Sequence, residues 1–301
     1  MQMLEMISLV IPTYNRLTRL RDCLHSVTKL AHTEYEILVV NDGSTDGTRA
    51  YLDSLTDPRI TVIHHEKNRG QSQARTSGFC QARGTIVAFT DDDCIVDSHW
   101  LNELESAVRF GSYDFVFGAT FYVNQQYQGY FPERLTSNGG GRWPGGANIA
   151  FTKKLLDRIG SFESTFDEYH NEDTELAIRA VASGARYGRV PQALVYHQPE
   201  TWTIRSLLAS SKNLAVWPVL KKMYPIHYLA FGGPARWRVV VEPSDYIKIA
   251  LLPLLIPLLL VRYWYHGKRG LLIFFTKWPV WILMRRWQVI RQAIRQRVFM
   301  V

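Results

Sequence analysis

The chain has 301 residues, with 35 Lys and Arg, 27 Asp and Glu, 47% hydrophobic residues and 3 Cys. This composition belongs to a folded chain with a buried core, and it excludes a disordered protein, a collagen and a polytopic transporter. Three widely spaced cysteines (Cys23, Cys80 and Cys94) cannot make a disulfide framework or a four-thiolate zinc site, which favours a reducing compartment.

The net charge of +8 lies entirely at the C-terminal end. After Asp245 there are ten Lys and Arg and no acid, so residues 1–245 keep 25 basic against 27 acidic residues, a net of −2. The ten basic residues stand among Trp, Leu and Ile. That mixture is typical of a segment that binds anionic lipid, and we expect no nucleic-acid partner.

The first 90 residues alternate between predicted strands and helices. Short apolar runs predict strands at 7–11, 36–40, 60–63 and 85–89. Helices are predicted between them, over about 17–30, 50–55 and 71–82. This alternation indicates crossover units and a mostly parallel sheet with both faces covered. No Gly-x-Gly-x-x-Gly turn follows the first strand and no Gly-Lys-Ser/Thr loop occurs, which excludes a Rossmann dehydrogenase and a phosphate-loop NTPase.

Polar segments follow strands one, two and four, at 12–15, 41–44 and 91–93. The carboxyl ends of parallel strands share one edge, where such sheets bind ligands. Carboxylates gathered there repel one another unless a cation or hydrogen-bond donors neutralise them. The three consecutive Asp therefore predict a site for Mg²⁺ or Mn²⁺, completed by substrate phosphates. The alternative is a solvated acidic turn.

The second half carries a glycine-rich loop and a further acidic pair. The loop at 139–146 contains Trp143 and is expected to serve as a lid or substrate shelf, or else as a spacer. Helices are predicted at 153–159 and 174–183. Glu172 and Asp173 precede the second of these, where acids also occur simply as helix caps. A strand at 193–196 ends in His197.

These segments, in this order, resemble family 2 glycosyltransferases. Residues 10–16, 39–46, 68–70 with 74–75, and 90–93 are similar to that family's nucleotide-sugar half, and 145–151, 160–163 and 172–176 to its acceptor half. The similarity runs from about residue 7 to about residue 200. It implies the GT-A fold, a Rossmann-like mostly parallel sheet flanked by helices. It also implies transfer of a sugar, with inversion, from a nucleotide-diphosphate donor.

The resemblance also implies roles for individual residues. Thr13 and Tyr14 would line the base pocket, and Asp91 would face the ribose and the sugar. The nucleotide sugar would be bound by Pro12, Thr13, Tyr14, Asn15, Asp42, Arg75, Asp91 and Asp92. Asp42 would accept a hydrogen bond from the base.

The metal and catalytic residues are implied in the same way. Asp93 would bind the cofactor, Mn²⁺ or Mg²⁺, and Asp173 would be the catalytic base, with Glu172 supporting the acceptor. His197 stands where some relatives have a histidine near the metal, which makes it a metal ligand or a structural histidine.

The sequence departs from the family pattern in three places. Asn41 replaces the commoner Asp, and Cys94 follows the acidic motif where many relatives have another carboxylate. The Gln-x-x-Arg-Trp signature of processive synthases is absent after Asp173, which favours transfer of a single sugar.

The basic end contains two apolar runs, at 249–261 and 271–284, each shorter than the ~20 residues of a spanning helix. A crossing would place basic residues on the outer side, against the positive-inside tendency. We therefore expect a monotopic attachment to the cytosolic leaflet, with a helical bundle packed on the catalytic domain as the alternative. Trp278, Trp281 and Trp287 suit the headgroup level, and an apolar stripe follows on a basic helix, at Trp287, Ile290, Ile294 and Val298.

These features divide the chain into a catalytic domain at 1–205, a helical connector at 206–245 and a membrane-associating tail at 246–301. The catalytic domain comprises a nucleotide-sugar half (1–120) and an acceptor half (121–205). The N-terminus shows no signal peptide, so we expect the protein at the cytoplasmic side of the cell membrane, acting on a glycan or lipid-linked acceptor. The alternatives are a membrane-bound sugar-nucleotide-binding protein without turnover and a nucleotidyltransferase.

Overall fold

The computed structural model describes residues 6–122, 133–134, 138–201, 203–265 and 269–301. The chain divides into two compact units. The first, which we call the sheet unit, comprises Met1–Val123, Thr136–Asp167 and Glu172–Gln198. The second, the helical unit, comprises Asn124–Leu135, Glu168–Asn171 and Pro199–Val301.

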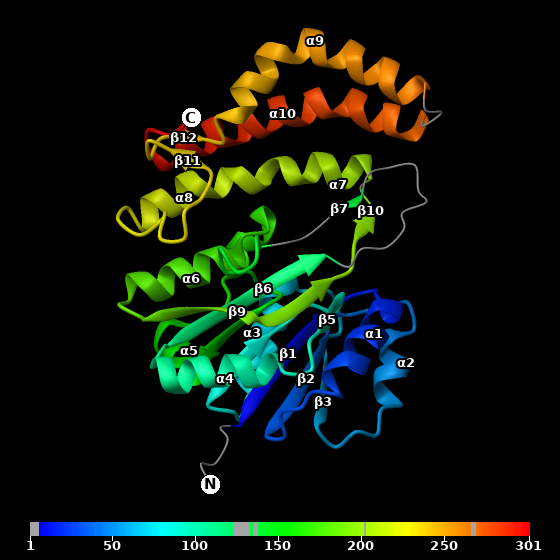
Figure 1. The fold of residues 1–301 in the computed structure, drawn as a ribbon, viewed down its shortest axis with the longest axis vertical. Helices are drawn as coiled ribbons and strands as arrows, with labels where there is room; N and C mark the ends of the chain where they lie inside the picture. The colour runs from blue at the N-terminus through cyan, green and yellow to red at the C-terminus, as the bar shows by residue number, and fades with distance from the viewer. Residues whose placement is uncertain (1–5, 123–132, 135–137, 202, 266–268) are drawn as a thin grey trace. The chain divides into compact units, whose positions relative to one another are not determined.

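The sheet unit is built on an eight-stranded sheet with the order β3-β2-β1-β4-β8-β6-β9-β5 (Figure 1). Strands β3, β2, β1 and β4 run parallel to one another, as do β6 and β9, whereas β8 and β5 are antiparallel to their neighbours. The strands are β1 (Ile7–Thr13), β2 (Tyr35–Asn41), β3 (Ile60–His64), β4 (Ile86–Phe89), β5 (Cys94–Val96), β6 (Phe115–Tyr122), β8 (Ile149–Thr152) and β9 (Tyr187–His197).

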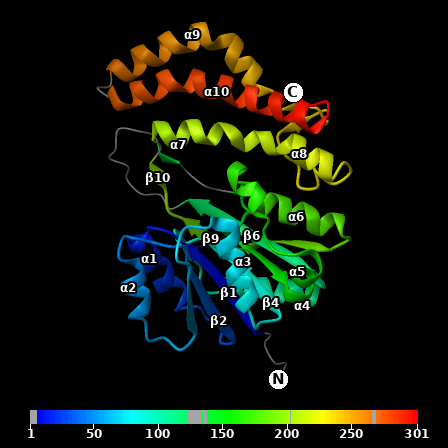
Figure 2. The ribbon, with the colours of Figure 1, turned by 180° about the vertical axis from the view of Figure 1, so that it is seen from behind.

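Helices cover both faces of this sheet. In Figure 1 helix α4 lies in front of the strands, and in Figure 2, which shows the reverse side, α3 lies in front. The helical elements are α1 (Leu17–Val27), α2 (Thr48–Asp53), α3 (Gln71–Gln81), α4 (Trp100–Gly111), α5 (Lys153–Ile159), the 3-10 helix η1 (Ser164–Tyr169) and α6 (Glu172–Ala182). The prediction of a mostly parallel sheet flanked by helices is confirmed.

The burial of β1 explains why its sequence is continuously apolar. All seven residues are buried, because alternate side chains face the two helical layers. Leu9 and Ile11 belong to the same core cluster as Leu20 of α1. On the other face, a Cβ at Gly78 of α3 would lie only 2.4 Å from Val10 Cγ1. Glycine at position 78 therefore lets α3 pack closely on β1.

The elements predicted in the first 90 residues are present, with ends shifted by a few residues at most. Strands β5 and β6 and helix α4 were not predicted. Helix α6 begins at Glu172 instead of Thr174, so Glu172 and Asp173 belong to its first turn. Strand β9 begins at Tyr187, six residues before the predicted start.

In the helical unit, α10 packs against α9 on one side and against α7, η2 and α8 on the other (Figures 1 and 2). The helical elements are α7 (Ile204–Ala209), η2 (Ser210–Ala215), α8 (Val216–Met223), α9 (Ser244–Tyr265) and α10 (Arg269–Gln296). Two short strand pairs complete it, β7 (Glu133–Arg134) with β10 (Glu200–Thr201), and β11 (Ala235–Arg236) with β12 (Val240–Val241).

The two apolar runs of the sequence lie within α9 and α10, which have 22 and 28 residues and contain Pro253, Pro257 and Pro279. Within the part of the chain that the structure describes, neither these helices nor any other combines the length and apolar character needed to cross a bilayer.

A buried ion cluster joins the start of α9 to α10. Asp245 is fully buried, and its carboxylate bonds Arg285 and lies 2.9 Å from Arg286 Nη2. Arg286 also donates to the carbonyl of Val241, the last residue of β12. We call these three charged side chains the Asp245 cluster. It uses the last acid of the sequence to hold two of the ten basic residues of the tail.

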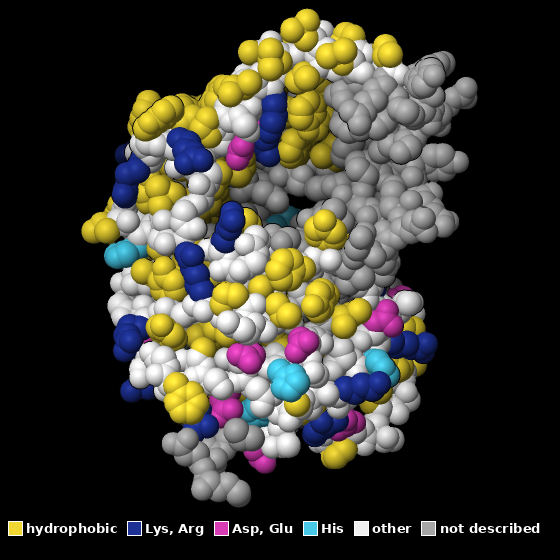
Figure 3. Space-filling view, viewed as in Figure 1, with side chains coloured by type: hydrophobic (Ala, Val, Ile, Leu, Met, Phe, Trp, Pro, Cys, Tyr) yellow, Lys and Arg dark blue, Asp and Glu magenta, His cyan; other side chains and the backbone are white. Residues whose placement is uncertain are grey.

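Both long helices expose apolar side chains. On α9 these follow a spacing of three and four residues, at Ile247, Leu251, Leu254, Leu258 and Val261, and on α10 they are Val280, Leu283, Trp287 and Ile294. Figure 3 shows hydrophobic side chains gathered over these helices. Of the predicted stripe, Trp287 and Ile294 are exposed, whereas Ile290 and Val298 are half-buried.

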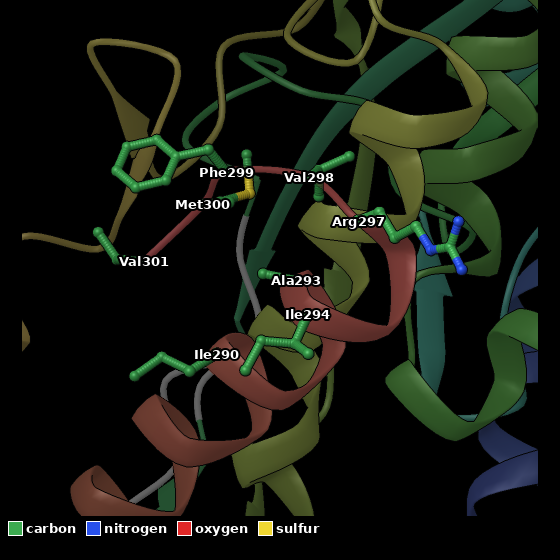
Figure 4. Close-up of a pocket in the computed structure, with 8 residues that line it drawn as sticks. All are labelled: Ile290, Ala293, Ile294, Arg297, Val298, Phe299, Met300 and Val301. Atoms are coloured by element: carbon green, nitrogen blue, oxygen red, sulfur yellow. The ribbon is translucent and has the colours of Figure 1, made fainter.

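A shallow hollow of about 360 Å³ lies at the end of α10 (Figure 4). It is lined by Ile290, Ala293, Ile294, Arg297, Val298, Phe299, Met300 and Val301. This lining holds no acid, histidine or cysteine, so the hollow offers no catalytic group.

Candidate functional site

The three polar segments meet at the carboxyl edge of the parallel strands, as the sequence predicts. Thr13 of β1 stands opposite Asn41 of β2, and the amide of Asp42 donates to the carbonyl of Thr13 at 2.9 Å. On the other side of β1, the amide of Thr90 donates to the carbonyl of Val10 at 3.3 Å. Parallel pairing thus carries residues 12–15, 41–44 and 90–93 to one place.

His197, in the second half of the chain, lies at the same edge. Strands β5 and β9 are antiparallel, and Cys94 pairs directly with His197. The amide of Gln198 donates to the carbonyl of Asp93 at 2.8 Å. As a result, one ligand atom each from Asp91, Asp93, Cys94 and His197 lies within 4.8 Å of the others. We call these four residues the Asp93 cluster.

The Asp93 cluster could hold a divalent cation. Nδ1 of His197 lies 2.8 Å from the carbonyl of Gln198, an acceptor, so Nδ1 carries the hydrogen. In the neutral ring Nε2 then presents a lone pair, 3.2 Å from Oδ1 of Asp93. Two carboxylates and one imidazole are a suitable ligand set for Mn²⁺. The role of His197 as a ligand stays a prediction.

Cys94 belongs to this cluster, although the sequence suggested only that a carboxylate was lost there. Its Sγ lies 4.0 Å from Oδ1 of Asp93. Burial, reinforced by the charges of Asp91 and Asp93, raises the pKa of the Cys94 thiol well above its ordinary value. Cys94 therefore faces the site as a neutral thiol.

Two arginines that were not predicted neutralise Asp93. Nη1 of Arg16 lies 2.8 Å, and Nη1 of Arg19 3.2 Å, from Oδ2 of Asp93. Arg16 precedes α1 directly and Arg19 lies in its first turn, so a spacing of three residues puts both on one side of the helix. That spacing, just after β1 at the ligand edge, was the available sequence signal.

Asp92 is buried, as Asp93 is, but it bonds a side chain of β1. The hydroxyl of Thr13 donates to Asp92 Oδ2 at 2.7 Å, and both side chains are buried. Burial raises the pKa of Asp92 to about 7, with Arg16 opposing and Asp93 adding to the rise. Thr13 and Asp92 thus bond each other, and their predicted contacts with the nucleotide sugar stay predictions.

Arg75 links the acidic motif to the predicted catalytic pair. Its guanidinium donates to Asp91 Oδ1 and to Glu172 Oε1, both at 2.6 Å, and its side chain is 1% exposed. Burial alone would lower the pKa of Arg75, but the charges of Asp91 and Glu172 hold it above its ordinary value. The predicted substrate-binding arginine is therefore a buried bridge between the two acids.

Asp173 and Glu172 have different surroundings. Asp173 is half-buried, and its carboxylate accepts bonds from the amides of Gly146, at 2.8 Å, and Thr174, at 2.6 Å. These two amide donors fix the direction of the Asp173 carboxylate. Glu172 is buried, which raises its pKa to about 7, with Arg75 opposing and Asp173 adding to the rise.

The glycine-rich loop passes directly beside this pair. A Cβ at Gly146 would lie 2.5 Å from Nη2 of Arg75, so only glycine allows the approach. Buried Asn138, which the sequence analysis missed, holds the loop to β6, because its side chain donates to the carbonyl of Gly118 at 2.8 Å and accepts from the amide of Thr120 at 2.8 Å. Trp143 remains 46% exposed, as a substrate shelf would require.

The residues predicted to contact the nucleotide differ in their exposure to solvent. Tyr14 and Asn15 are exposed, Pro12 is buried, and Asn15 Oδ1 accepts from the amide of Thr45 at 2.7 Å. The carboxylate of Asp42 already accepts from the amides of Arg69 and Gly70, both at 2.9 Å, and bonds His65 at 2.6 Å. Asp42 thus shapes the loop before α3, and its contact with a base stays a prediction.

The chain matches the family model described as "Glycosyl transferase family 2" over residues 8–172. That range contains the three strand-end segments at 12–15, 41–44 and 91–93 and ends at Glu172, before Asp173 and His197. The chain belongs to glycosyl transferase family 2. This confirms the family indicated by the motifs and the enzyme class that goes with it, a glycosyltransferase.

Individual relatives agree with this assignment. The chain is 33% identical over 131 residues to "Glycosyltransferase GlyG" from Streptococcus pneumoniae, a match that covers 43% of each chain. The matched part is thus less than half of that relative's length. Among solved structures, the mannosyltransferase PcManGT from Pyrobaculum calidifontis, in complex with GDP-Man and Mn²⁺, has a TM-score of 0.62 at 19% identity and covers 96% of this chain and 88% of its own.

A second solved structure, TarS 1-349 from S. aureus in complex with UDP-GlcNAc, has a TM-score of 0.59 at 18% identity. It covers 96% of this family 2 chain and 89% of its own. At these identities the structural likeness establishes the fold, which is the predicted GT-A type.

Proposed function

We propose that this glycosyltransferase transfers a single sugar, with inversion at the anomeric carbon, from a nucleotide-diphosphate donor to an acceptor hydroxyl, with Mn²⁺ or Mg²⁺ as cofactor. One observation carries the proposal. The Asp93 cluster lies at the ligand edge of the sheet, and Arg75 connects its Asp91 to Glu172 beside Asp173. One bonded network thus joins a metal-binding group to Glu172, the residue that directly precedes the candidate base.

In the proposed reaction the acceptor oxygen forms a bond to the anomeric carbon while the bond from that carbon to the diphosphate oxygen breaks. The nucleoside diphosphate leaves with the electron pair, and the acceptor proton passes to Asp173. Asp173 suits this role because it is half-buried and bonded by the Gly146 and Thr174 amides, which fix its direction. One displacement needs one base and no covalent intermediate.

Asp93, Asp91 and His197 would hold the metal. When bound, the ion supplies positive charge that stabilises the leaving diphosphate. Glu172 and Arg75 would fix the position of Asp91, because the buried guanidinium bonds both acids. Trp143 would shelter the sugar from water, since it lies on the loop that bonds Asp173 through Gly146.

The donor is tested by a thermal-shift panel of nucleotide sugars with Mn²⁺. GDP- and UDP-sugars are the first choices, because the mannosyltransferase and TarS structures contain GDP-Man and UDP-GlcNAc. A ligand at 100 times its Kd stabilises the fold by about 2.7 kcal/mol. No stabilisation by any nucleotide sugar would contradict the proposal. Metal-dependent transfer or hydrolysis of the donor separates it from a binding protein without turnover and from a nucleotidyltransferase.

We further propose that the helical unit attaches to the cytosolic leaflet and that the acceptor is a lipid-linked or membrane-proximal glycan. The exposed apolar faces of α9 and α10 and the ten basic residues after Asp245 support attachment to anionic lipid. An enzyme held there reaches a lipid-linked acceptor without extracting it from the membrane.

Co-sedimentation with phosphatidylcholine vesicles containing about one third phosphatidylglycerol tests the attachment. We expect Trp287→Ser combined with Ile294→Ser to weaken binding about tenfold, since each loses apolar burial. Phe110→Ser is the matched control, because Phe110 is also exposed but belongs to α4 of the sheet unit. Equal binding by all three proteins would contradict attachment through α10.

A further inference from the structure

Asp93 divides its two carboxylate oxygens between two kinds of partner. Oδ1 lies 3.2 Å from Nε2 of His197. Oδ2 accepts from Arg16 at 2.8 Å and from Arg19 at 3.2 Å. The side towards His197 is thus the side for a metal, whereas the other side is held by guanidinium groups.

The arginines are far more accessible than the acid they bind. Asp93 is 2% exposed, but Arg16 and Arg19 are 39% and 28% exposed. Their long side chains therefore reach from the surface to a buried carboxylate. A guanidinium in such a position can turn to a second anion arriving from solvent without unfolding its helix.

The charges around the site indicate what that anion is. Four carboxylates (Asp91, Asp92, Asp93 and Glu172) pair with three guanidinium groups (Arg16, Arg19 and Arg75), and the carboxylate of Asp173 lies beside Glu172. A divalent ion would compensate the excess of negative charge, but a donor diphosphate would then restore it. Arg75 is buried between Asp91 and Glu172, which leaves Arg16 and Arg19 as the accessible cations.

We propose that Arg16 and Arg19 form a clamp for the diphosphate of the donor, and that this clamp rests on Asp93 until metal and donor bind. The inference rests on the proposed function and deepens it. A cation bound by Asp93 withdraws charge from the carboxylate and weakens its hold on the arginines. Guanidinium groups bind phosphate oxygens through paired charge-assisted hydrogen bonds, so the released side chains engage the diphosphate next to the ion.

The clamp predicts opposite changes in two affinities. In Arg16→Gln combined with Arg19→Gln, Asp93 loses its resting partners, so Mn²⁺ alone should bind about 3–10-fold more tightly. At saturating Mn²⁺ the same variant should bind UDP or GDP about 10–100-fold more weakly, because the diphosphate loses its charge-assisted bonds. Isothermal titration calorimetry measures both affinities without turnover.

Arg21→Gln is the matched control. Arg21 belongs to the same helix and stacks over Tyr51, with its guanidinium carbon 4.8 Å from the ring centre. The substitution removes one guanidinium charge, as Arg19→Gln alone does, and we expect less than about a twofold change in either affinity. Arg19→Gln alone, checked by its melting curve, gives the answer if the double variant does not fold.

A metal-free experiment tests the resting position itself. With EDTA present, Asp93→Asn should bind UDP or GDP more tightly than the wild type, because the arginines are released. The gain should disappear when Arg16→Gln and Arg19→Gln are added.

Each outcome separates the two proposals. A wild type that binds neither Mn²⁺ nor UDP and GDP contradicts the proposed function, and the clamp with it. Normal binding by the wild type, with no loss of UDP and GDP affinity in the arginine variants, overturns the clamp alone. Weaker Mn²⁺ binding by those variants would also overturn it.

Discussion

Two buried aspartates, Asp93 in the sheet unit and Asp245 in the helical unit, are each held by two arginines, yet their surroundings differ. The Asp245 cluster is closed, because Asp245 is 0% exposed and Arg285 and Arg286 are 12% and 6% exposed. Asp93 is as deeply buried, but its arginines reach the surface. The same pair of residue types therefore makes a closed structural joint in one unit and an accessible site in the other.

The neighbours of each aspartate reinforce this difference. Asp93 lies within ligand distance of Asp91, Cys94 and His197, groups that can bind a cation. At Asp245 the ammonium of Lys248 lies 3.7 Å from Oδ1, and Arg286 also donates to the carbonyl of Val241, so neither neighbour adds a negative ligand. Two features thus distinguish the site at Asp93 from the structural joint at Asp245. The arginines of the site reach the surface, and further side chains beside Asp93 can bind a metal ion.

The largest effect on activity is expected for a substitution of Asp173, the proposed catalytic base. Asp173→Asn should reduce turnover by about 10²–10⁴-fold, because the amide cannot take the acceptor proton. Donor affinity should stay unchanged, since the metal-binding residues are intact. Steady-state kinetics with a matched titration of donor check both parts. Unaltered turnover would remove Asp173 from its proposed role.

Unfolding in urea tests the difference between Asp93 and Asp245, because it measures how much each aspartate contributes to stability. Asp245→Asn should destabilise the helical unit by about 3–5 kcal/mol, since it leaves two buried arginines uncompensated. Asp93→Asn should cost about 1 kcal/mol or less, because Arg16 and Arg19 can turn to water. If Asp93→Asn were the more damaging change, the distinction between site and joint would be wrong.

Mn²⁺ should stabilise only a protein with an intact Asp93 cluster. At 100 times its Kd the ion should stabilise the wild type by about 2.7 kcal/mol, and this gain should be absent in Asp93→Asn and His197→Ala. Asp157→Asn is the control, because Asp157 is exposed and pairs with Lys153 at 2.9 Å on α5. A full Mn²⁺ shift in His197→Ala would exclude that histidine as a ligand.

The smallest effect concerns pH. Burial raises the pKa of Glu172 from 4.5 to about 7. The folded state therefore holds the proton more tightly than the unfolded state, and the associated stability is present below pH 4.5 and lost as pH rises through 7. Between pH 5 and pH 8 the free energy of unfolding of the wild type should fall by about 2 kcal/mol relative to that of Glu172→Gln. Parallel pH profiles of the two proteins would show that Glu172 does not titrate in this range.

Local patterns predicted the first half of the sheet unit well. The continuous apolar run of β1 and the strand-end position of Asp91 and Asp93 follow from short-range rules, and both are confirmed by the strand order. Cys94 could not be placed in this way, because its neighbour His197 is brought by a pairing between strands about 100 residues apart. Arg16 and Arg19 were not predicted, because the strand-end pattern marks the acids of this edge and not the cations that pair with them.

The tail shows a different limit of sequence reading. Counting apolar residues between charges gave two short runs, whereas the helices continue through three prolines and through the basic residues at their ends. Helix length depends on packing of α10 between its neighbours, which no local pattern encodes. The domain boundaries at 205 and 245, the cytosolic location and the membrane attachment stay predictions.

The most direct test of the account is a crystal grown with Mn²⁺ and UDP or GDP, measured at the manganese absorption edge. The anomalous signal should show one Mn²⁺ within about 2.0–2.4 Å of a carboxylate oxygen of Asp93, and the diphosphate should be bonded by Arg16 or Arg19. A manganese peak elsewhere, or a nucleotide bound with no ion at this edge, would contradict the account.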